Sequence, residues 1–380
     1  MKKILIILLI LCSTYIVHAE ELVPNARNAL LIEPTTKSIL FEKNIHEEVS
    51  IASLTKMMGL TLIFEKIEDG TIKYDDMVTA SSKASGMGGS QIWLETGEEM
   101  RVDDLIKGII MASANDGIVA MAEYISGTEE KFVEMMNDKA KALGLKNTHF
   151  VNASGLDEEN HYSSAYDVAL MAIELMNHPD VFKYTTIYED YLRKDTNNKF
   201  WLVNTNKLLK TYKGVDGLKT GMTDKAGYSM AVTAKRGDMR LLAIVLGEKE
   251  GKVRNQETME LLDYGFNNYE VLKIKDKGDV VSKITIDKAD SNEIEVVVGS
   301  DVLILQKKGE EKKEYLSEVK LKDLKLPIKK GEVIGELLIK EQNNVVKKVS
   351  LVSNHDIHKK NFLDLYFHIL KSMLTGNIIK

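Results

Sequence analysis

The chain has 380 residues, of which 44% are hydrophobic and 28% charged, a composition typical of a globular protein of two or three domains. Its formal net charge of −6 argues against a nucleic-acid-binding protein, because neutralising phosphates requires a basic surface. The single cysteine, Cys12, lies in the first apolar run, which excludes a disulfide framework, a cysteine nucleophile and cysteine-ligated zinc.

The first 19 residues have the pattern of an export signal. Lys2 and Lys3 give a positive start, residues 4–12 form an apolar run, and Val17-His18-Ala19 supplies small residues at the −3 and −1 positions of a cleavage site. A retained transmembrane helix is the alternative, but the apolar run is too short to cross a bilayer comfortably. We therefore expect a signal peptide over residues 1–19 and an exported mature protein.

Residues 20–268 are expected to form the larger domain, in which hairpins alternate with helices. A turn at 34–37 predicts a hairpin of strands 29–33 and 38–41. Helical patterns follow at 53–68, at 103–126 with a polar break at 113–115, at 128–143, and at 163–177 with Ser163 as the N-cap. A second hairpin, of strands 228–235 and 239–246, precedes a helix over 251–266.

The composition changes near residue 270. Short β-type runs separated by charged residues and glycines predict a small all-β domain over residues 269–353. Residues 354–380 have the pattern of an amphipathic helix, because the large apolar side chains between 362 and 374 fall on one broad face. His355 and His358 lie three apart on this predicted helix, but no carboxylate-rich partner segment indicates a metal site.

This terminal helix is expected to hold the protein on the outer face of the cytoplasmic membrane. Four lysines against one aspartate between residues 359 and 380 give the segment a local charge of +3, which suits anionic lipid headgroups. Its apolar stretch is too short to span a bilayer, so we expect it to lie in the membrane interface. The alternative is that the helix packs on the surface of the all-β domain.

Three short motifs carry the chemistry. In chain order they are Ser53-Leu54-Thr55-Lys56, Ser113-Ala114-Asn115 and Lys219-Thr220-Gly221. Ser317-Glu318-Val319-Lys320 matches the first template too, but it lies in the β-rich region, where a surface polar pair is expected. The other two motifs each occur once. All three in this order favour an enzyme with an activated serine.

The residue types explain that chemistry. Ser53 and Lys56 share one face of a helix start, and a serine hydroxyl needs a neighbouring base before it becomes a good nucleophile. Burial, the helix N-terminus and a second cation at Lys219 would lower the pKa of Lys56 enough for it to act as that base. Asn115 offers an amide to hold Lys56 and a substrate carbonyl, and Ser113 is placed to relay a proton to the leaving amine.

The third motif is suited to binding a carboxylate. On a strand edge, Lys219 and Thr220 would supply a cation and a hydroxyl, and Gly221 would let a substrate backbone approach. No metal or other cofactor is expected for such a reaction. The alternative is that Ser53 only caps a helix and Lys56 is solvated, but this leaves the other two motifs unexplained.

These motifs and their surroundings resemble those of the D-alanyl-D-alanine carboxypeptidases, the low-molecular-mass penicillin-binding proteins. The similar segments are Ile51 to Met58, Gly89-Ser90, Met111 to Asp116, Thr148 to Leu156 and Lys219 to Tyr228. The resemblance covers residues 22–266. It implies a mixed α/β penicillin-binding, β-lactamase-like transpeptidase fold with an antiparallel sheet and a helical subdomain, followed by the small all-β domain and the C-terminal amphipathic helix.

The resemblance also implies roles for individual residues. Ser53 would be the acylated nucleophile, Lys56 the general base, Ser113 the proton relay, and Lys219 a ligand of the substrate's terminal carboxylate. Arg254 matches an arginine that the family uses to grip that carboxylate, and a guanidinium fork suits this task. The alternative for Arg254 is a helix-surface residue near Glu257.

The expected reaction is removal of the terminal D-alanine from peptidoglycan stem peptides, with β-lactams as covalent inhibitors. A β-lactamase is disfavoured because it needs a Glu-x-x-Leu-Asn element, and the nearest match, Glu174-Leu175-Met176-Asn177, lies inside a predicted helix. An endopeptidase that cuts cross-links shares all three motifs and remains open. An inactive wall-binding module is the remaining alternative, which the complete motifs disfavour.

Overall fold

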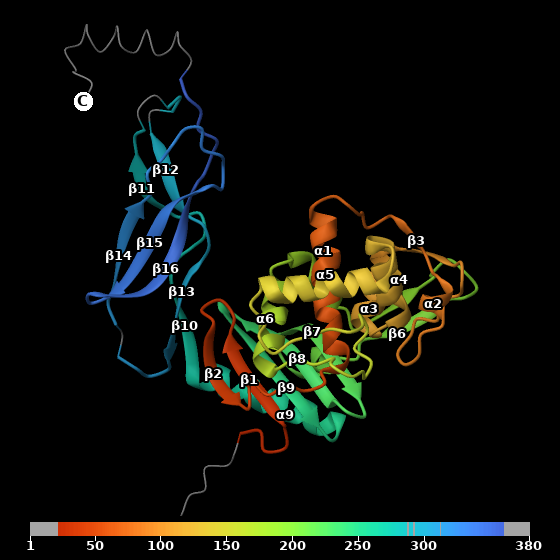
Figure 1. Cartoon of the computed structure of the whole chain (residues 1–380). Helices are drawn as coiled ribbons and strands as arrows, with labels where there is room; N and C mark the ends of the chain where they lie inside the picture. The colour runs from red at the N-terminus through yellow and green to blue at the C-terminus, as the bar shows by residue number, and fades with distance from the viewer. Residues whose placement is uncertain (1–21, 287–288, 292, 312, 361–380) are drawn as a thin grey trace, which may run out of the picture.

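The computed structural model describes residues 22–360, apart from 287, 288, 292 and 312. It consists of a larger domain, which combines a five-stranded antiparallel sheet with helices, and a second body built of strands (Figure 1). This is the mixed α/β architecture followed by an all-β domain that the sequence predicts. The predicted signal peptide lies outside the described residues.

The central sheet joins the two predicted hairpins. The strands are β1 (Asn28–Glu33), β2 (Ser38–Lys43), β7 (Val215–Thr223), β8 (Gly227–Arg236) and β9 (Met239–Glu248). Their order is β2-β1-β9-β8-β7, so the N-terminal hairpin pairs with the last strand of the domain, and Leu30 lies opposite Ile244. Strand β7, which carries the Lys-Thr-Gly motif, forms one edge of the sheet.

Helices cover both faces of this sheet, which explains why every residue of β1 is buried. Leu30 and Ile32 belong to the core shared with the helical subdomain. Ala29 and Leu31 point to the other face, where they join the core that includes residues of α9 (Gly251–Asn268). The period-two alternation of a strand thus divides its side chains between two hydrophobic cores.

The helical subdomain lies between the two hairpins in sequence. Its longer helices are α1 (Lys56–Glu68), α3 (Val102–Met111), α4 (Asn115–Ser126), α5 (Glu129–Ala142) and α6 (Ala165–Met176). Its shorter helices are α2 (Ser82–Ser85), η2 (Pro179–Val181), α7 (Phe182–Thr185) and α8 (Leu208–Thr211). Two small antiparallel strand pairs also belong to it: β3 (Met77–Thr79) with β4 (Glu99–Arg101), and β5 (Glu189–Leu192) with β6 (Phe200–Val203). The helices predicted within this subdomain are therefore all present.

Two details of the helices differ from the prediction. A 3₁₀ turn, η1 (Ala52–Thr55), precedes α1, so Ser53 lies on that turn and not on the α-helix itself. Ser164, not Ser163, caps α6, and its hydroxyl accepts a hydrogen bond from the backbone N–H of Asp167. Ser163 cannot serve as the cap because its backbone pairs with Val49 in an isolated bridge.

The second domain is all-β, as predicted. Its strands are β10 (Tyr269–Lys275), β11 (Val280–Ile284), β12 (Ile294–Val298), β13 (Val302–Lys307), β14 (Tyr315–Leu321), β15 (Val333–Glu341) and β16 (Asn344–Ser353). Strands β10 and β13 pair, and the other five form a sheet in the order β11-β12-β16-β15-β14. The ammonium of Lys347 donates to the carbonyl of Thr35 (3.2 Å), so this domain contacts the β1–β2 turn.

The terminal helix is not present where it is predicted to begin. Residues 354–360 contain no helix: Asn354 and His355 lie in a bend, and Ile357 bridges to Ile328. Ile357 is fully buried in the core of the β domain, and burying this side chain outweighs the helical pattern around it. His355 and His358 therefore do not share a helix face. The rest of the predicted helix, residues 361–380, lies outside the described residues.

The described residues contain no helix with both the length and the apolar character needed to cross a bilayer.

Candidate active site

The three motifs meet at the edge of the central sheet. The Lys56 amine lies 2.8 Å from the hydroxyl of Ser53 and 2.6 Å from the amide oxygen of Asn115. The ammonium of Lys219 donates to the hydroxyl of Ser113 (2.8 Å). Residues 53, 113 and 219, which are far apart in the sequence, thus form one continuous polar cluster.

The backbone around Ser53 is held by close approaches from two glycines. A Cβ at Gly155, whose φ is +82°, would lie 2.0 Å from the carbonyl oxygen of Ala52. A Cβ at Gly221 would lie 2.9 Å from the carbonyl of Ile51 and 3.1 Å from the nitrogen of Ser53. Gly221 is thus required by the chain's own η1 turn, and the approach of a substrate backbone to it stays a prediction.

Lys56 is fully buried and has three polar neighbours. Two of them, the amide oxygen of Asn115 and the carbonyl of Ser154 (2.5 Å), can only accept hydrogen bonds, whereas the Ser53 hydroxyl can also donate. As an ammonium, Lys56 donates to all three, and as a neutral amine it can keep both acceptors and turn its lone pair to the Ser53 hydroxyl. The geometry therefore matches that of a base aimed at Ser53.

The electrostatics favour the same protonation state. Burial lowers the pKa of Lys56 well below its usual value, and the positive charge of Lys219 lowers it further. Asp116 opposes this shift, but its carboxylate is occupied by the backbone N–H groups of Ile92 and Leu94 (3.0–3.1 Å). The lowered pKa predicted from the sequence is therefore present in the structure.

Asn115 is oriented by contacts on both sides of its amide. Its Nδ2 donates to the carbonyl of Gly88 (2.7 Å), and its backbone N–H donates to the carbonyl of Ser90 (2.7 Å). These contacts fix Oδ1 toward Lys56. The segment around residues 88–90 thus sets the orientation of the second motif.

Lys219, Thr220 and Arg254 form the basic end of the cluster. Burial, together with the charge of Arg254, lowers the pKa of Lys219 to about 7. Arg254 is also buried, and that burial lowers its pKa to about 10. The Thr220 hydroxyl donates to the hydroxyl of Thr205 (2.7 Å).

Neither Lys219 nor Arg254 has an acidic partner among the described residues. The guanidinium of Arg254 reaches only the amide oxygen of Asn255 and, at 3.5 Å, the carbonyl of Ser229. Glu257, the neighbour that would make Arg254 a surface ion pair, instead accepts the backbone N–H groups of Asn25 and Ala26. Two buried cations without a counter-charge constitute a site prepared for an anion.

Three contributors to the cluster could not be found from residue type and spacing. The carbonyl of Ser154 and the hydroxyl of Thr205 are generic groups that only the fold brings to Lys56 and Thr220. His161 lies behind the η1 turn, where its Nε2 is 2.8 Å from the hydroxyl of Thr55. The backbone N–H of Val151 donates to its Nδ1, so the proton of the neutral ring is on Nε2.

His161 is expected to make the protein sensitive to acid. Burial lowers its pKa to about 4, below the unfolded value of 6.5, so the unfolded chain binds the extra proton first as the pH falls. Stability is therefore complete above pH 6.5 and declines toward pH 4, by on the order of 3 kcal/mol. Urea unfolding between pH 7 and pH 4 should show a smaller decline for His161→Gln and the wild-type decline for His46→Gln, since His46 is exposed and does not contribute to the pKa shift of His161. Equal declines for wild type and His161→Gln would contradict this assignment.

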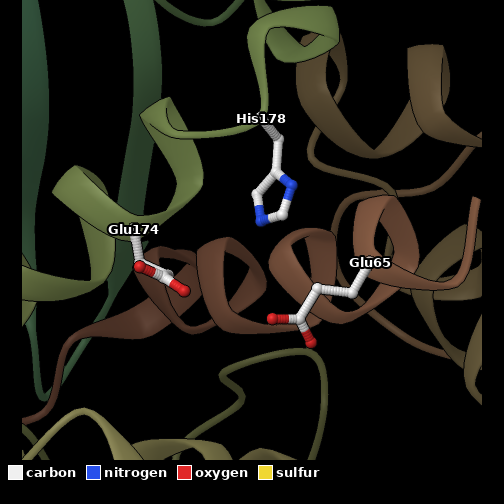
Figure 2. A group of neighbouring side chains, drawn as sticks. All are labelled: Glu65, Glu174 and His178. Carbon is white, nitrogen blue, oxygen red and sulfur yellow. The ribbon is translucent and has the colours of Figure 1, made fainter. Parts of the chain in front are cut away.

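A second group of ligand-type side chains lies at the far end of α1. Glu65, Glu174 and His178 each offer one possible metal-ligand atom, and these atoms lie within 4.8 Å of one another. Figure 2 shows the three side chains converging from α1 and from the end of α6. The ammonium of Lys139 lies 2.5 Å from Glu65 and 2.6 Å from Glu174, so a built-in cation already balances the two carboxylates. Glu174, the residue nearest to a β-lactamase glutamate, is thus committed to Lys139 inside a regular helix.

The chain is similar to known proteins over nearly its whole length. The profile of the D-alanyl-D-alanine carboxypeptidase family matches residues 16–250, and that of the penicillin-binding protein 5 C-terminal domain matches residues 269–359. The D-alanyl-D-alanine carboxypeptidase DacF of Bacillus subtilis is 46% identical over 91% of this chain and 89% of its own length.

Solved structures are similar as well. Penicillin-binding protein 5 from Haemophilus influenzae superposes with a TM-score of 0.70 at 32% identity, over 88% of this chain and 98% of its own. The ampicillin-bound form of penicillin-binding protein D2 from Listeria monocytogenes superposes with a TM-score of 0.58 at 31% identity, over 64% of this chain and 98% of its own. With the sequence motifs, these matches establish that the chain belongs to the D-alanyl-D-alanine carboxypeptidase family.

Proposed function

We propose that this protein is a serine-type carboxypeptidase that removes the terminal D-alanine from peptidoglycan stem peptides. The observation that carries the proposal is the environment of the buried Lys56 amine. Its nitrogen contacts two groups that can only accept hydrogen bonds, the amide oxygen of Asn115 and the carbonyl of Ser154, and its third contact is the Ser53 hydroxyl. The buried cations Lys219 and Arg254 add a site for the free carboxylate at which such a peptide ends.

In the proposed mechanism, Ser53 attacks the carbonyl of the penultimate residue while its proton passes to Lys56. The backbone N–H groups of Ser53 and Met222 would stabilise the oxyanion, since Gly221 lies directly against the Ser53 nitrogen. Ser113, which accepts a hydrogen bond from Lys219, would give its proton to the leaving D-alanine amine and receive the Ser53 proton from Lys56 in exchange, so that Lys56 is neutral again. Water then hydrolyses the ester on Ser53, with Lys56 again as the base.

β-Lactams are proposed to acylate the same serine. Their strained amide and adjacent carboxylate offer the same two features that Ser53 and the Lys219–Arg254 pair would recognise in a peptide. The ampicillin-bound form of the Listeria relative supports this proposal. No step of the proposed mechanism involves a metal or another cofactor.

Mass spectrometry of a D-Ala-D-Ala-terminated pentapeptide incubated with the pure protein tests this function. Loss of one alanine is the expected result. Cleavage only of cross-linked dimers would indicate an endopeptidase, and rapid turnover of a penicillin without peptide cleavage would indicate a β-lactamase. Either outcome would overturn the proposal.

Recognition of the terminal carboxylate by Lys219 and Arg254 predicts a strong effect of amidating the peptide. Removing one partner of a desolvated, charge-assisted pair typically costs about 2–5 kcal/mol, so kcat/KM for the amide should fall by about 30-fold or more. Arg254→Ala should lower kcat/KM for the acid peptide far more than for the amide. An unchanged acid-to-amide ratio in Arg254→Ala would leave Lys219 as the only carboxylate ligand.

We also propose that the mature protein works outside the cytoplasmic membrane and is held there by its C-terminal segment. The export pattern of residues 1–19 supports this location, since the peptidoglycan substrate lies outside the membrane. The local charge of +3 between residues 359 and 380, in a chain that is otherwise acidic, supports attachment to anionic lipids.

Deleting residues 361–380 should release the protein from membranes while leaving its activity on a small soluble peptide intact. The deletion must begin after Lys360, because Ile357 belongs to the core of the β domain. Co-sedimentation with vesicles containing anionic lipid measures the binding. Equal sedimentation of the full and truncated proteins would refute the anchor, and so would failure of the full-length protein to bind.

A further inference from the structure

Trp93 is held in a position that folding alone does not explain. Its side chain is 67% exposed, the highest value among the large hydrophobic residues that the structure describes. Its φ of +58° lies in the left-handed region, which is unfavourable for a bulky side chain. Exposure and backbone strain together indicate that the residue is kept for a function.

The backbone on both sides of Trp93 is clamped. On the inner side, the carboxylate of Asp116 accepts the N–H groups of Ile92 and Leu94. On the outer side, the guanidinium of Arg193 donates to the carbonyls of Ile92 (3.0 Å) and Trp93 (3.2 Å) and also pairs with Glu98 (2.6 Å). The indole is therefore presented to solvent on a rigid support.

This support is continuous with the active site. Asp116 directly follows Asn115, the residue that holds Lys56. The backbone N–H of Asn115 donates to the carbonyl of Ser90, three residues before Trp93. A ligand that rests on Trp93 would thus be placed relative to the site of cleavage by a short and rigid connection.

Trp93 borders a hollow of about 810 Å³, which Phe200 also lines. Two pairs of the charged groups that line this hollow form ion pairs, Arg193 with Glu98 and Arg101 with Asp104, and the other charged residues, Glu95, Glu99 and Lys199, leave a formal charge of −1. Its remaining polar lining includes the amides of Asn197 and Asn198 and the hydroxyl of Thr196. The hollow therefore offers aromatic faces and hydrogen-bonding groups with little net charge.

This chemistry fits a sugar better than a peptide. The C–H face of a pyranose ring stacks on the electron-rich face of an indole, and its hydroxyls pair with amides and carboxylates. A charged stem peptide would favour a lining with an excess of one charge, and an apolar peptide would favour walls without paired ions. The observations therefore select an uncharged polyhydroxylated ligand.

We propose that Trp93 and this hollow form a saccharide subsite that binds the glycan strand to which the stem peptide is attached. The proposal rests on the peptidoglycan substrate proposed above and adds a second point of recognition to it. Trp201 provides a natural comparison, because it is also exposed (57%) but has an ordinary backbone conformation and does not line the hollow.

Direct binding can be read from tryptophan fluorescence, because the chain contains only two tryptophans. In Trp201→Phe the sole reporter is Trp93, and titration with a β-1,4-linked tetramer of N-acetylglucosamine should give a saturable change in its emission. Trp93→Phe, which reports only from Trp201, should show no such change. If the Trp201→Phe protein shows no saturable change, the subsite is refuted, whatever its peptidase activity.

Kinetics separates a sugar contact from a peptide contact. For a pentapeptide attached to uncross-linked glycan, Trp93→Ala should lower kcat/KM about tenfold, which corresponds to ~1.4 kcal/mol. For the free pentapeptide, the same substitution should leave kcat/KM unchanged. Trp201→Ala should change neither, and Trp93→Tyr should restore most of the loss. Equal decreases of kcat/KM on both substrates would show that Trp93 contacts the peptide. An unchanged kcat/KM on both substrates would show that Trp93 has no role in substrate recognition. If the wild type cleaves neither substrate, the proposed function fails instead, while the fluorescence titration still decides the sugar site.

Discussion

Replacing Ser53 with alanine is expected to abolish covalent labelling by a fluorescent penicillin and to reduce D-alanine release by at least roughly 10⁴-fold. Among the described residues, its hydroxyl is the one that faces the buried amine of Lys56, at 2.8 Å. Removing it leaves the base without a nucleophile to activate. Gel fluorescence and a D-alanine assay measure the two effects, and the η1 turn should remain folded because Ser53 is only partly buried.

Ser317→Ala is the matched control, because Ser317 and Lys320 repeat the Ser-x-x-Lys spacing. They lie on the exposed strand β14, where residues three apart point to opposite faces, so this lysine cannot activate this serine. Labelling and turnover of Ser317→Ala should equal those of the wild type. Labelling that persists in Ser53→Ala, or that disappears in Ser317→Ala, would show that the nucleophile has been assigned to the wrong residue.

Lys56→Ala is expected to slow acylation by on the order of 10³-fold or more, because the base that receives the Ser53 proton is gone. It should also destabilise the protein by about 2–4 kcal/mol. The substitution leaves a cavity in a fully buried position and removes the donor that satisfies Asn115 and Ser154. Stopped-flow acylation and urea unfolding measure the two effects separately.

Lys56→Met distinguishes loss of the base from loss of packing. Methionine fills most of the lysine's volume and cannot take up a proton, so it should be as inactive as alanine while losing less stability. If Lys56→Met acylates at more than about a tenth of the wild-type rate, Lys56 is not the general base.

The sequence predicts the parts of the site that depend on reactive side chains. Ser53, Lys56, Ser113, Asn115 and Lys219 belong to motifs whose spacing has a chemical reason, and the structure brings them together. The sequence also predicts both hairpins of the central sheet, since each joins alternating apolar runs through a clear turn.

The sequence does not reveal the backbone groups and close contacts that the fold brings to the site. The carbonyl of Ser154 becomes a ligand of Lys56 only because Gly155 lets its segment pass within contact of Ala52. The sequence alone does not show that Gly221 packs against the η1 turn, because that contact depends on distances that only the fold sets. Residues 354–360 have a helical pattern, yet Ile357 contributes more by completing the β core than a helix turn would.

The central claim, an acyl-enzyme on Ser53 formed with release of D-alanine, can be tested by trapping the intermediate. Wild-type protein is mixed with a D-Ala-D-Ala-terminated pentapeptide, quenched in acid within its first turnovers, digested and mapped by mass spectrometry. The expected result is that the fragment containing Ser53 carries the mass of the peptide acyl group without its terminal alanine. An adduct on another residue, or an adduct that retains both alanines, would contradict the mechanism.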